Sequence, residues 1–312
     1  MELIRGLHNL RAKHRGCVAT VGAFDGVHRG HQWVLKQVKE RAEQLNLPST
    51  VILFEPLPKE YFQPLEAPAR ISNFREKVEA LAELGVDRVL RVTFNERVQQ
   101  MSAEAFIQNV FAEGLGAKFV VLGDDFRFGN DREGDFDLMQ RRGERYGFEC
   151  AATPTYEFEG GRVSSTRIRA SLEAGNFEEA ALLLGRPFSM EGHVVYGKQL
   201  GRQLGFPTAN IRLLRLRAPV NGVFAVRVDG PGLSSAPAIA NVGVRPTVND
   251  SITANLEVHL IDRSLDLYGK RIKVTFLHKV RDEIKFDGID QLKERVLADI
   301  DDARSWFASE KV

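Results

Sequence analysis

Apolar and polar positions alternate with two different periods along the chain. From Cys17 to about Ala152, short apolar runs are separated by longer segments in which apolar residues recur every three or four positions. This order is typical of a parallel sheet covered by helices and predicts a doubly wound α/β fold. The apolar runs are 17–24, 49–56, 88–94, 119–124 and 149–155, and the helical segments include 31–45, 72–85, 102–116 and 165–185.

The period changes after Gly185. Short strand-like segments follow, separated by Gly, Pro, Asn or Asp, and they predict an antiparallel barrel or sandwich. A helical period returns over 291–307, where Leu292, Val296, Ile300, Ala303 and Phe307 lie on one face. We therefore predict an α/β domain over 1–184 and a small β-barrel domain with a terminal helix over 185–312.

Composition limits the possible partners and compartment. The 43 basic and 42 acidic side chains of the 312 residues nearly cancel, which disfavours nucleic-acid and membrane partners. Two isolated cysteines indicate neither a disulfide framework nor a structural zinc site. The N-terminus lacks the apolar run of a signal peptide, and no apolar stretch is long enough to span a bilayer. We expect a cytoplasmic protein that binds small molecules, and its oligomeric state stays open.

The first candidate site is the stretch VGAFDGVHRGHQ at 21–32. His28 and His31 follow the first predicted strand, at the sheet edge where α/β proteins bind ligands, and share one side of a helical turn beside free N–H groups. Zinc would need a third ligand, and the HExxH spacing is absent. Two solvated surface histidines are the other alternative. The flanking glycines admit a ligand to the backbone, so we favour phosphate binding.

Two further segments offer polar groups for the same site. In VSSTRIRASL, Ser164, Ser165 and Thr166 precede a helix that carries Arg169. Such a helix start is either an ordinary N-cap or a phosphate cradle, and the two interpretations are compatible. In GDDFRFG, Asp125 follows the fourth predicted strand at the same edge, although this segment is also typical of a polar turn.

Together, GAFDGVHRGH with its HxGH core, GDDFRFG and SSTRIR resemble the nucleotidyltransferase half of the bacterial bifunctional riboflavin kinase/FMN adenylyltransferases (FAD synthetases), which has a Rossmann-like fold. HxGH alone also occurs in other adenylyltransferases and in class I aminoacyl-tRNA synthetases. The resemblance implies that His28 and His31 hold the ATP phosphates. It implies that Asp125 faces the nucleotide or the flavin. The implied nucleotide-binding set is Gly22, Phe24, Asp25, Gly30, Asp125, Ser164, Ser165, Thr166 and Arg169. The family often has Asn where Ala23 stands.

The second half lacks the GxxxxGK(S/T) motif of Walker-type phosphotransferases, but GRQLGFPTAN offers another phosphate site. Pro207 favours an extended backbone, so Thr208 and Asn210 point to the same face with a hydroxyl and an amide oxygen, which are donors that Mg²⁺ accepts. A plain turn is the alternative. Gly197 and Gly205 leave room for a nucleotide against the backbone.

Glu257 is an acidic residue in an otherwise apolar strand, NLEVHLID. It is either a general base that takes a proton from an attacking hydroxyl or one partner of a cross-strand ion pair. His259 shares its face, and for it we favour a packing or orienting role.

The stretches GKQLGRQLGFPTANI, AIANVGVRPTV, LEVHLID and LYGKRIKVTF resemble the riboflavin kinase module of the same family. The resemblance implies a six-stranded antiparallel barrel in which Gly197, Gly205, Pro207, Thr208 and Asn210 bind ATP. Thr208 and Asn210 would contact Mg²⁺, and Glu257 would activate the riboflavin 5′-hydroxyl. The implied enzyme makes FMN and then FAD from riboflavin with two ATP.

Two alternatives to this enzyme stay in view. One is a flavin- or nucleotide-binding regulator or carrier without turnover, which has little need of Glu257 and the two histidines. The other is a tRNA-linked enzyme, which the near-neutral charge and the lack of a helical anticodon-type domain oppose.

Overall fold

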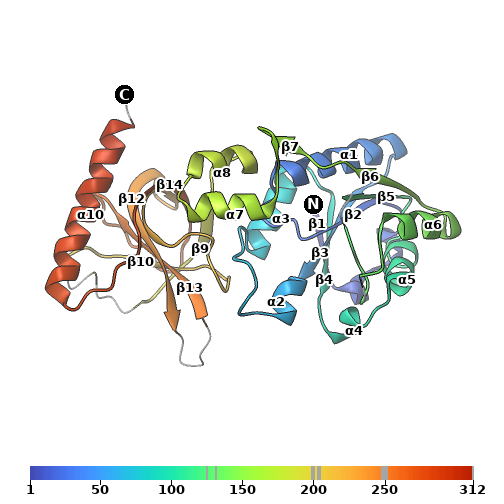
Figure 1. Cartoon of the computed structure of the whole chain (residues 1–312), viewed down its shortest axis with the longest axis horizontal. Coiled ribbons are helices and arrows are strands. Elements are labelled where there is room, and N and C mark those ends of the chain that lie inside the picture. The colour runs from blue at the N-terminus through green and yellow to red at the C-terminus, as the bar shows by residue number, and fades with distance from the viewer. Residues whose placement is uncertain (124–125, 131, 198–200, 202–204, 247–251, 311–312) are drawn as a thin grey trace. The chain divides into compact units, whose positions relative to one another are not determined.

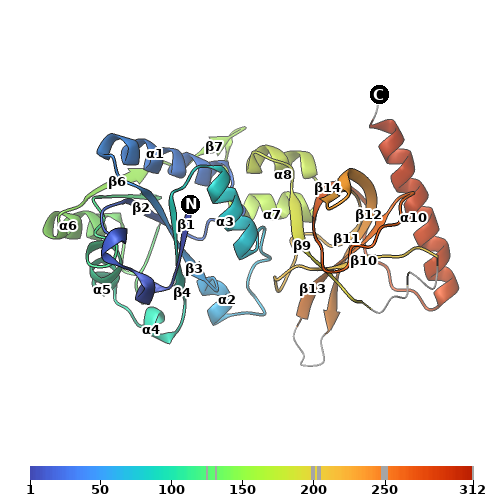
Figure 2. The same cartoon turned by 180° about the vertical axis from the view of Figure 1, so that it is seen from behind.

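The computed structural model describes residues 1–123, 126–130, 132–197, 201, 205–246 and 252–310, with the side chains of 244–246 and 252–253 left aside (Figures 1 and 2). Two compact units are present. We call residues 1–68 and 77–164 the sheet unit, and residues 69–76 and 165–312 the barrel unit.

The sheet unit is built on a six-stranded sheet in the order β1-β4-β3-β2-β5-β6, in which all neighbouring strands are parallel. The predicted parallel α/β fold is confirmed. The strands are β1 Glu2–Arg5, β2 Val18–Val21, β3 Ser49–Glu55, β4 Arg88–Thr93, β5 Phe119–Gly123 and β6 Glu149–Thr153, and a short hairpin joins β7 Glu157–Phe158 to β8 Gly161–Arg162. β1 was not predicted, because its four residues contain an apolar run of only two.

Helices cover both faces of this sheet. On one face, Val38 of α1 packs in a cluster with Val121, and on the other Phe111 packs in the cluster of Val120. This coverage explains why the central strands are continuous apolar runs. The helical elements are η1 Leu7–Asn9, η2 Ala12–His14, α1 Arg29–Leu45, α2 Pro58–Phe62, α3 Phe74–Glu83, α4 Glu96–Gln99, α5 Ala103–Phe106, the π-helical η3 Ile107–Ala112, and α6 Phe136–Tyr146.

The barrel unit is a closed six-stranded barrel in the order β10-β13-β12-β11-β14-β9, and every neighbouring pair is antiparallel. The predicted barrel is confirmed, and the sandwich alternative is wrong. The strands are β9 Ser189–Val195, β10 Ala209–Arg212, β11 Gly222–Gly230, β12 Leu233–Pro246, β13 Ile252–Leu260 and β14 Arg271–Arg281. The helices are α7 Ser165–Glu173, α8 Phe177–Leu184 and α10 Ile289–Ser309.

The terminal helix α10 lies along the outside of the barrel (Figure 1). Its residues Ile300, Ala303 and Phe307 are buried with Val223 and Ile239 of the barrel wall. The stripe predicted for 291–307 therefore marks the face that packs against the strands.

The segment before the barrel strands also packs on the barrel. The helix expected over 165–185 is interrupted at Gly175, whose φ of +77° ends α7, and Asn176 caps α8 through the backbone N–H of Glu179. The Phe177 ring lies 5.8 Å from that of Phe224 and 6.0 Å from that of Phe276. Helices α7 and α8 therefore belong to the compact barrel unit. Our predicted domain boundary lies after residue 184 and stays a prediction.

Residues 69–76 are tied to the barrel unit by a buried ion pair. The fully buried Arg215 side chain donates from Nη2 to both carboxylate oxygens of Glu76, at 2.5 and 2.7 Å. The same guanidinium donates to the carbonyls of Arg70 and Ile71. Among the helices that the structure describes, none combines the length and the apolar character needed to cross a membrane.

Candidate active sites

The loop from β2 to α1 is tightly wound. Phe24 and Val27 have positive φ angles of +46° and +43°, and Gly26 lies between them at +84°. Left-handed backbone at a bulky residue costs on the order of 1 kcal/mol or more, and surrounding contacts must compensate for it. The side chains of Phe24 and Val27 are buried in the unit, so packing holds the loop in this conformation.

His28 and His31 lie side by side where this loop enters the helix. His28 is buried and caps α1, with its Nδ1 accepting a hydrogen bond from the backbone N–H of His31 at 3.3 Å. The two rings are stacked, with centroids 3.6 Å apart, and the Phe24 ring lies 4.9 Å from that of His31. The pair therefore borders the start of α1, where the first backbone N–H groups have no partner within the helix itself. Its role in phosphate binding stays a prediction.

The half-buried His31 is electrically neutral at pH 7. Burial lowers its pKa well below the usual 6.5, and the charges of His28 and Lys77 lower it further. Its Nδ1 is buried and has no hydrogen-bond partner among the described residues. A buried ring nitrogen of this kind is a place where a ligand can complete the hydrogen bonding.

This lowered pKa predicts how stability depends on pH. Because the folded pKa lies below the unfolded one, the unfolded chain binds more protons, and stability falls as pH drops below about 6.5. We expect His31→Gln to remove about 1 kcal/mol of the free-energy loss seen in urea unfolding between pH 7 and pH 5.5. His8→Gln, on an exposed side chain, is the control. An equal loss in wild type and His31→Gln would contradict the prediction.

A buried lysine that the sequence analysis missed supports the same loop. Lys77 in α3 is fully buried, and its Nζ donates to the carbonyl of Ala23 at 2.6 Å. Lysine is almost never buried without partners. The signal in the sequence was a lysine on the apolar stripe of the predicted helix 72–85, in line with the buried Ala80 and Leu81. Because Ala23 has no polar side chain, its contact with Lys77 is made by its backbone carbonyl.

The predicted glycines of this site allow close packing. A Cβ on Gly22 would lie 3.1 Å from the Phe24 ring, and one on Gly30 would lie 3.2 Å both from the His28 ring and from the carbonyl oxygen of Val163. A side chain at either position would displace the rings. Asp25 is buried in the same loop. Asp125 lies outside the described residues, as does Asp124.

The predicted second phosphate motif falls at a unit boundary. Ser164 ends the sheet unit, whereas Ser165, Thr166 and Arg169 belong to α7 in the barrel unit. Arg169 donates from Nε to the carbonyl of Ala69 at 2.6 Å, and Thr166 is exposed. An approach of these residues to the histidines stays a prediction.

An aromatic cluster at the carboxyl edge of the sheet was also missed. Tyr61 and Phe62 of α2, which follows β3, contact Phe94, which follows β4, with ring centroids 5.3–5.7 Å apart. Phe62 is 55% exposed. Exposed aromatic faces offer a stacking surface for a planar ligand.

A row of polar side chains crosses three strands of the barrel. Asn210 in β10 lies directly opposite Glu257 in β13, and Asn241 in β12 lies opposite Glu257 on its other side. Residues in register share a face of the sheet, so the three point the same way. Asn255 donates from Nδ2 to Glu257 Oε1 at 3.0 Å, which orients the carboxylate. Strand pairing therefore builds this row from distant segments.

Asn210 fits the role of a metal ligand. It is buried, and its Oδ1 has no hydrogen-bond partner in the part of the chain that the structure describes. A Cβ on Gly197 would overlap the Asn210 carboxamide, and Gly205 has a φ of +93° that favours glycine. The Thr208 hydroxyl, two residues earlier, is a second hard oxygen donor of the kind that Mg²⁺ accepts, and the binding of Mg²⁺ by these two residues stays a prediction.

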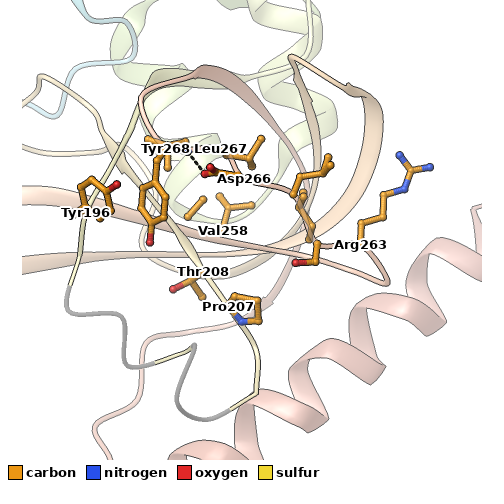
Figure 3. Close-up of a pocket in the computed structure, with 13 residues that line it drawn as sticks. Tyr196, Pro207, Thr208, Val258, Arg263, Asp266, Leu267 and Tyr268 are labelled. Carbon is orange, nitrogen blue, oxygen red and sulfur yellow. Dashed lines mark hydrogen bonds between the residues drawn. The ribbon is translucent and has the colours of Figure 1, made fainter.

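A cavity of about 530 Å³ lies in the barrel unit, and Thr208 is part of its lining (Figure 3). Pro207 and Thr208 form one part of its wall, and Tyr196 and Tyr268 stack at another with ring centroids 4.1 Å apart. The Asp266 carboxylate accepts from the backbone N–H of Tyr268 at 3.1 Å. Aliphatic side chains line much of the remainder, namely Val194, Ala209, Val258, Leu260, Leu265 and Leu267. The size and lining suit a planar ring with a polar tail.

The loop of this cavity, Arg263–Tyr268, was not predicted to belong to a site. The available signal was the stretch LYGK, which we used only for the resemblance.

Comparison with known proteins covers both units. The family profile for FAD synthetase matches residues 10–167, and that for riboflavin kinase matches residues 184–307. The bifunctional riboflavin kinase/FMN adenylyltransferase of Pseudomonas fluorescens is 50% identical, over 99% of this chain and 98% of its own. The protein of the same name from Escherichia coli K12 is 48% identical, over 100% and 99%.

A solved structure shows the same fold. A protein from Streptococcus pneumoniae, described as a macrolide-efflux protein, is similar with a TM-score of 0.77 and 32% identity, over 98% of this chain and all of that one. Both family profiles fall in order along one chain, and the curated relatives align from end to end. The chain therefore belongs to the family of bifunctional riboflavin kinase/FMN adenylyltransferases.

Proposed function

We propose that the chain phosphorylates riboflavin to FMN with one ATP and adenylylates FMN to FAD with a second, releasing pyrophosphate. The observation that carries the proposal is the presence of both family segments in one chain, each with its polar site. Full-length relatives carry the name of the bifunctional enzyme, and none of these comparisons favours a carrier or regulator without turnover.

The adenylyl transfer belongs to the sheet unit. An oxygen of the FMN phosphate attacks the α-phosphorus of ATP in line, and the bond from that phosphorus to the bridging oxygen of pyrophosphate breaks. The protein supplies orientation and stabilises charge on the phosphate oxygens, so no covalent nucleophile is needed. His28, His31 and the N-terminus of α1 are the groups assigned to this role, with His31 acting as a neutral hydrogen-bonding ring.

The phosphoryl transfer belongs to the barrel unit. Glu257 takes the proton from the ribityl 5′-hydroxyl, whose oxygen attacks the γ-phosphorus of ATP as ADP departs. The cavity beside Thr208 accommodates the ATP, with its base between aliphatic and tyrosine walls. Thr208 and Asn210 would hold Mg²⁺, which when bound neutralises charge on the phosphates.

The planar flavin of the second reaction has a matching surface. The aromatic cluster of Tyr61, Phe62 and Phe94 lies at the carboxyl edge of the sheet, where β3 and β4 end. That edge is also where β2 leads to His28 and His31. We place the isoalloxazine ring of FMN on this cluster, because exposed aromatic faces stack with planar rings.

We also propose a cytoplasmic protein with small-molecule partners. Its two cysteines are free, and burial raises the pKa of Cys17 to about 11 and that of Cys150 to about 12. Both thiols therefore stay protonated and poorly reactive, which suits a role in packing.

The test is direct. Purified protein incubated with riboflavin, ATP and Mg²⁺ is expected to form FMN first and FAD later, as seen by chromatography of the flavins. Chelation of Mg²⁺ is expected to stop FMN formation. If the protein binds flavin but returns riboflavin unchanged, it is a carrier and the proposal is wrong.

A further inference from the structure

His259 makes one contact that the mechanism above does not use. It lies in β13 two residues after Glu257, so both side chains are on the same face. Its Nδ1 lies 2.9 Å from the carbonyl oxygen of Pro207. A carbonyl oxygen only accepts hydrogen bonds, so Nδ1 carries a hydrogen and donates it. The neutral Nδ1–H tautomer and the imidazolium both meet this requirement.

The hydrogen bond from His259 to Pro207 lies just beyond the end of the β10–β13 strand pair. The β10–β13 ladder starts with the pair Ala209 and Val258. Just before β10 begins, the His259 side chain reaches the peptide that joins Pro207 to Thr208. Proline has no N–H to anchor this backbone. The preceding Phe206 is buried, and its ring is nearly perpendicular to that of His259, with centroids 6.5 Å apart. The His259 side chain thus adds one hydrogen bond between the two segments beyond the last backbone pair.

That peptide holds the start of Thr208. Because the peptide unit is planar, fixing the Pro207 carbonyl also fixes the plane that contains the N and Cα atoms of Thr208, from which its side chain extends. Thr208 lines the cavity of Figure 3, and Asn210, two residues later, is the register partner of Glu257. A shift in this peptide would move both phosphate-side groups relative to the base, and small misplacements cost much in group transfer.

We propose that His259 is a positioning residue of the riboflavin kinase site, which holds Thr208 in place for MgATP through the Pro207 carbonyl. This inference rests on the proposed function of the barrel unit. It requires one N–H at the Nδ1 position and no proton transfer by the imidazole. An asparagine amide N–H can occupy roughly that position, whereas a glutamine amide reaches the region of Nε2.

The experiment compares His259→Asn, His259→Gln and His259→Ala. We expect Ala and Gln to raise the KM for MgATP in riboflavin phosphorylation about tenfold, with a smaller change in kcat, because one hydrogen bond is lost. Asn is expected to restore the KM to near the wild-type value. Adenylylation of supplied FMN should be unchanged in all three. His278→Ala, which removes a ring stacked on Trp306 in the same unit, is the matched control and should leave the KM for MgATP unchanged.

Two results would overturn the proposal. One is His259→Asn failing like His259→Ala while melting like the wild type. The other is a series that changes only the melting temperature and leaves the KM for MgATP unaltered. If wild-type protein made no FMN, the proposed function would fail instead. The His259 variants would then be compared by their affinity for MgATP in calorimetry. All variants keep the ATP site of the sheet unit, so only the barrel site should differ between them. The proposal then requires weaker binding in the Ala and Gln variants and near-wild-type binding in the Asn variant.

Discussion

Replacing Glu257 with glutamine is expected to lower riboflavin phosphorylation by about 10²- to 10⁴-fold while leaving adenylylation of supplied FMN unchanged. The carboxylate stands half-buried in the polar row of the barrel, where Asn255 donates to its Oε1. Glutamine keeps the shape and can still accept from Asn255. It cannot take the proton of an attacking hydroxyl, so the loss should appear in kcat rather than in the KM for ATP.

Chromatography of the flavins gives both rates from one protein, since riboflavin and FMN can be supplied separately. Glu294→Gln, on the exposed face of α10, is the matched control and should behave as wild type. If Glu257→Gln retained full phosphorylation, the carboxylate would be a structural partner of Asn255 and the base would have to be sought elsewhere. If it abolished both reactions in a folded protein, the assignment of one reaction to each unit would be wrong.

The two architectures were predictable because each leaves a different period in the sequence. Runs such as STVILFE are apolar throughout because helices cover both faces of the parallel sheet. Each barrel strand buries the side chains that point into the barrel, and it buries outward-pointing side chains only where α10 covers them. The apolar runs of these strands are therefore shorter and are interrupted by polar residues. The four-residue β1 is too short to show a hydrophobic period. The helical period over 165–185 predicted a helix, but it did not indicate that Gly175 would interrupt that helix.

The sites were less predictable, because they depend on contacts between distant segments. His28 and His31 are local, and their spacing was enough to place them on one helical turn. Alternation could place Glu257 and His259 on one face, but only the strand register shows that Asn210 and Asn241 flank Glu257. Similarly, nothing near Lys77 in the sequence indicates that its Nζ reaches Ala23, 54 residues away. The residue types therefore indicated the chemistry of each site. The residues that contact these side chains could be identified only from the tertiary structure.

Replacing His28 separates its two roles, because the residue both caps α1 and presents an imidazole to the predicted ATP site. Asparagine is a good N-cap and can accept from the backbone N–H of His31, so His28→Asn should keep the unfolding free energy within about 0.5 kcal/mol of wild type. Alanine cannot cap and should cost about 1 kcal/mol. If the imidazole stabilises the phosphates, both variants should lower FAD formation from FMN by about 10²- to 10³-fold.

The capping effect has its own control in the same unit. Ser102 caps α5 by accepting from the backbone N–H of Ala105, so Ser102→Ala should cost a similar amount of stability without slowing adenylylation. Riboflavin phosphorylation should be unchanged in all three variants. If His28→Asn formed FAD at the wild-type rate, the histidine would be only a cap, and the anion site would consist of the helix start and His31. A slow but stable His28→Asn would instead show that the imidazole itself acts on the nucleotide, since the helix start is then intact.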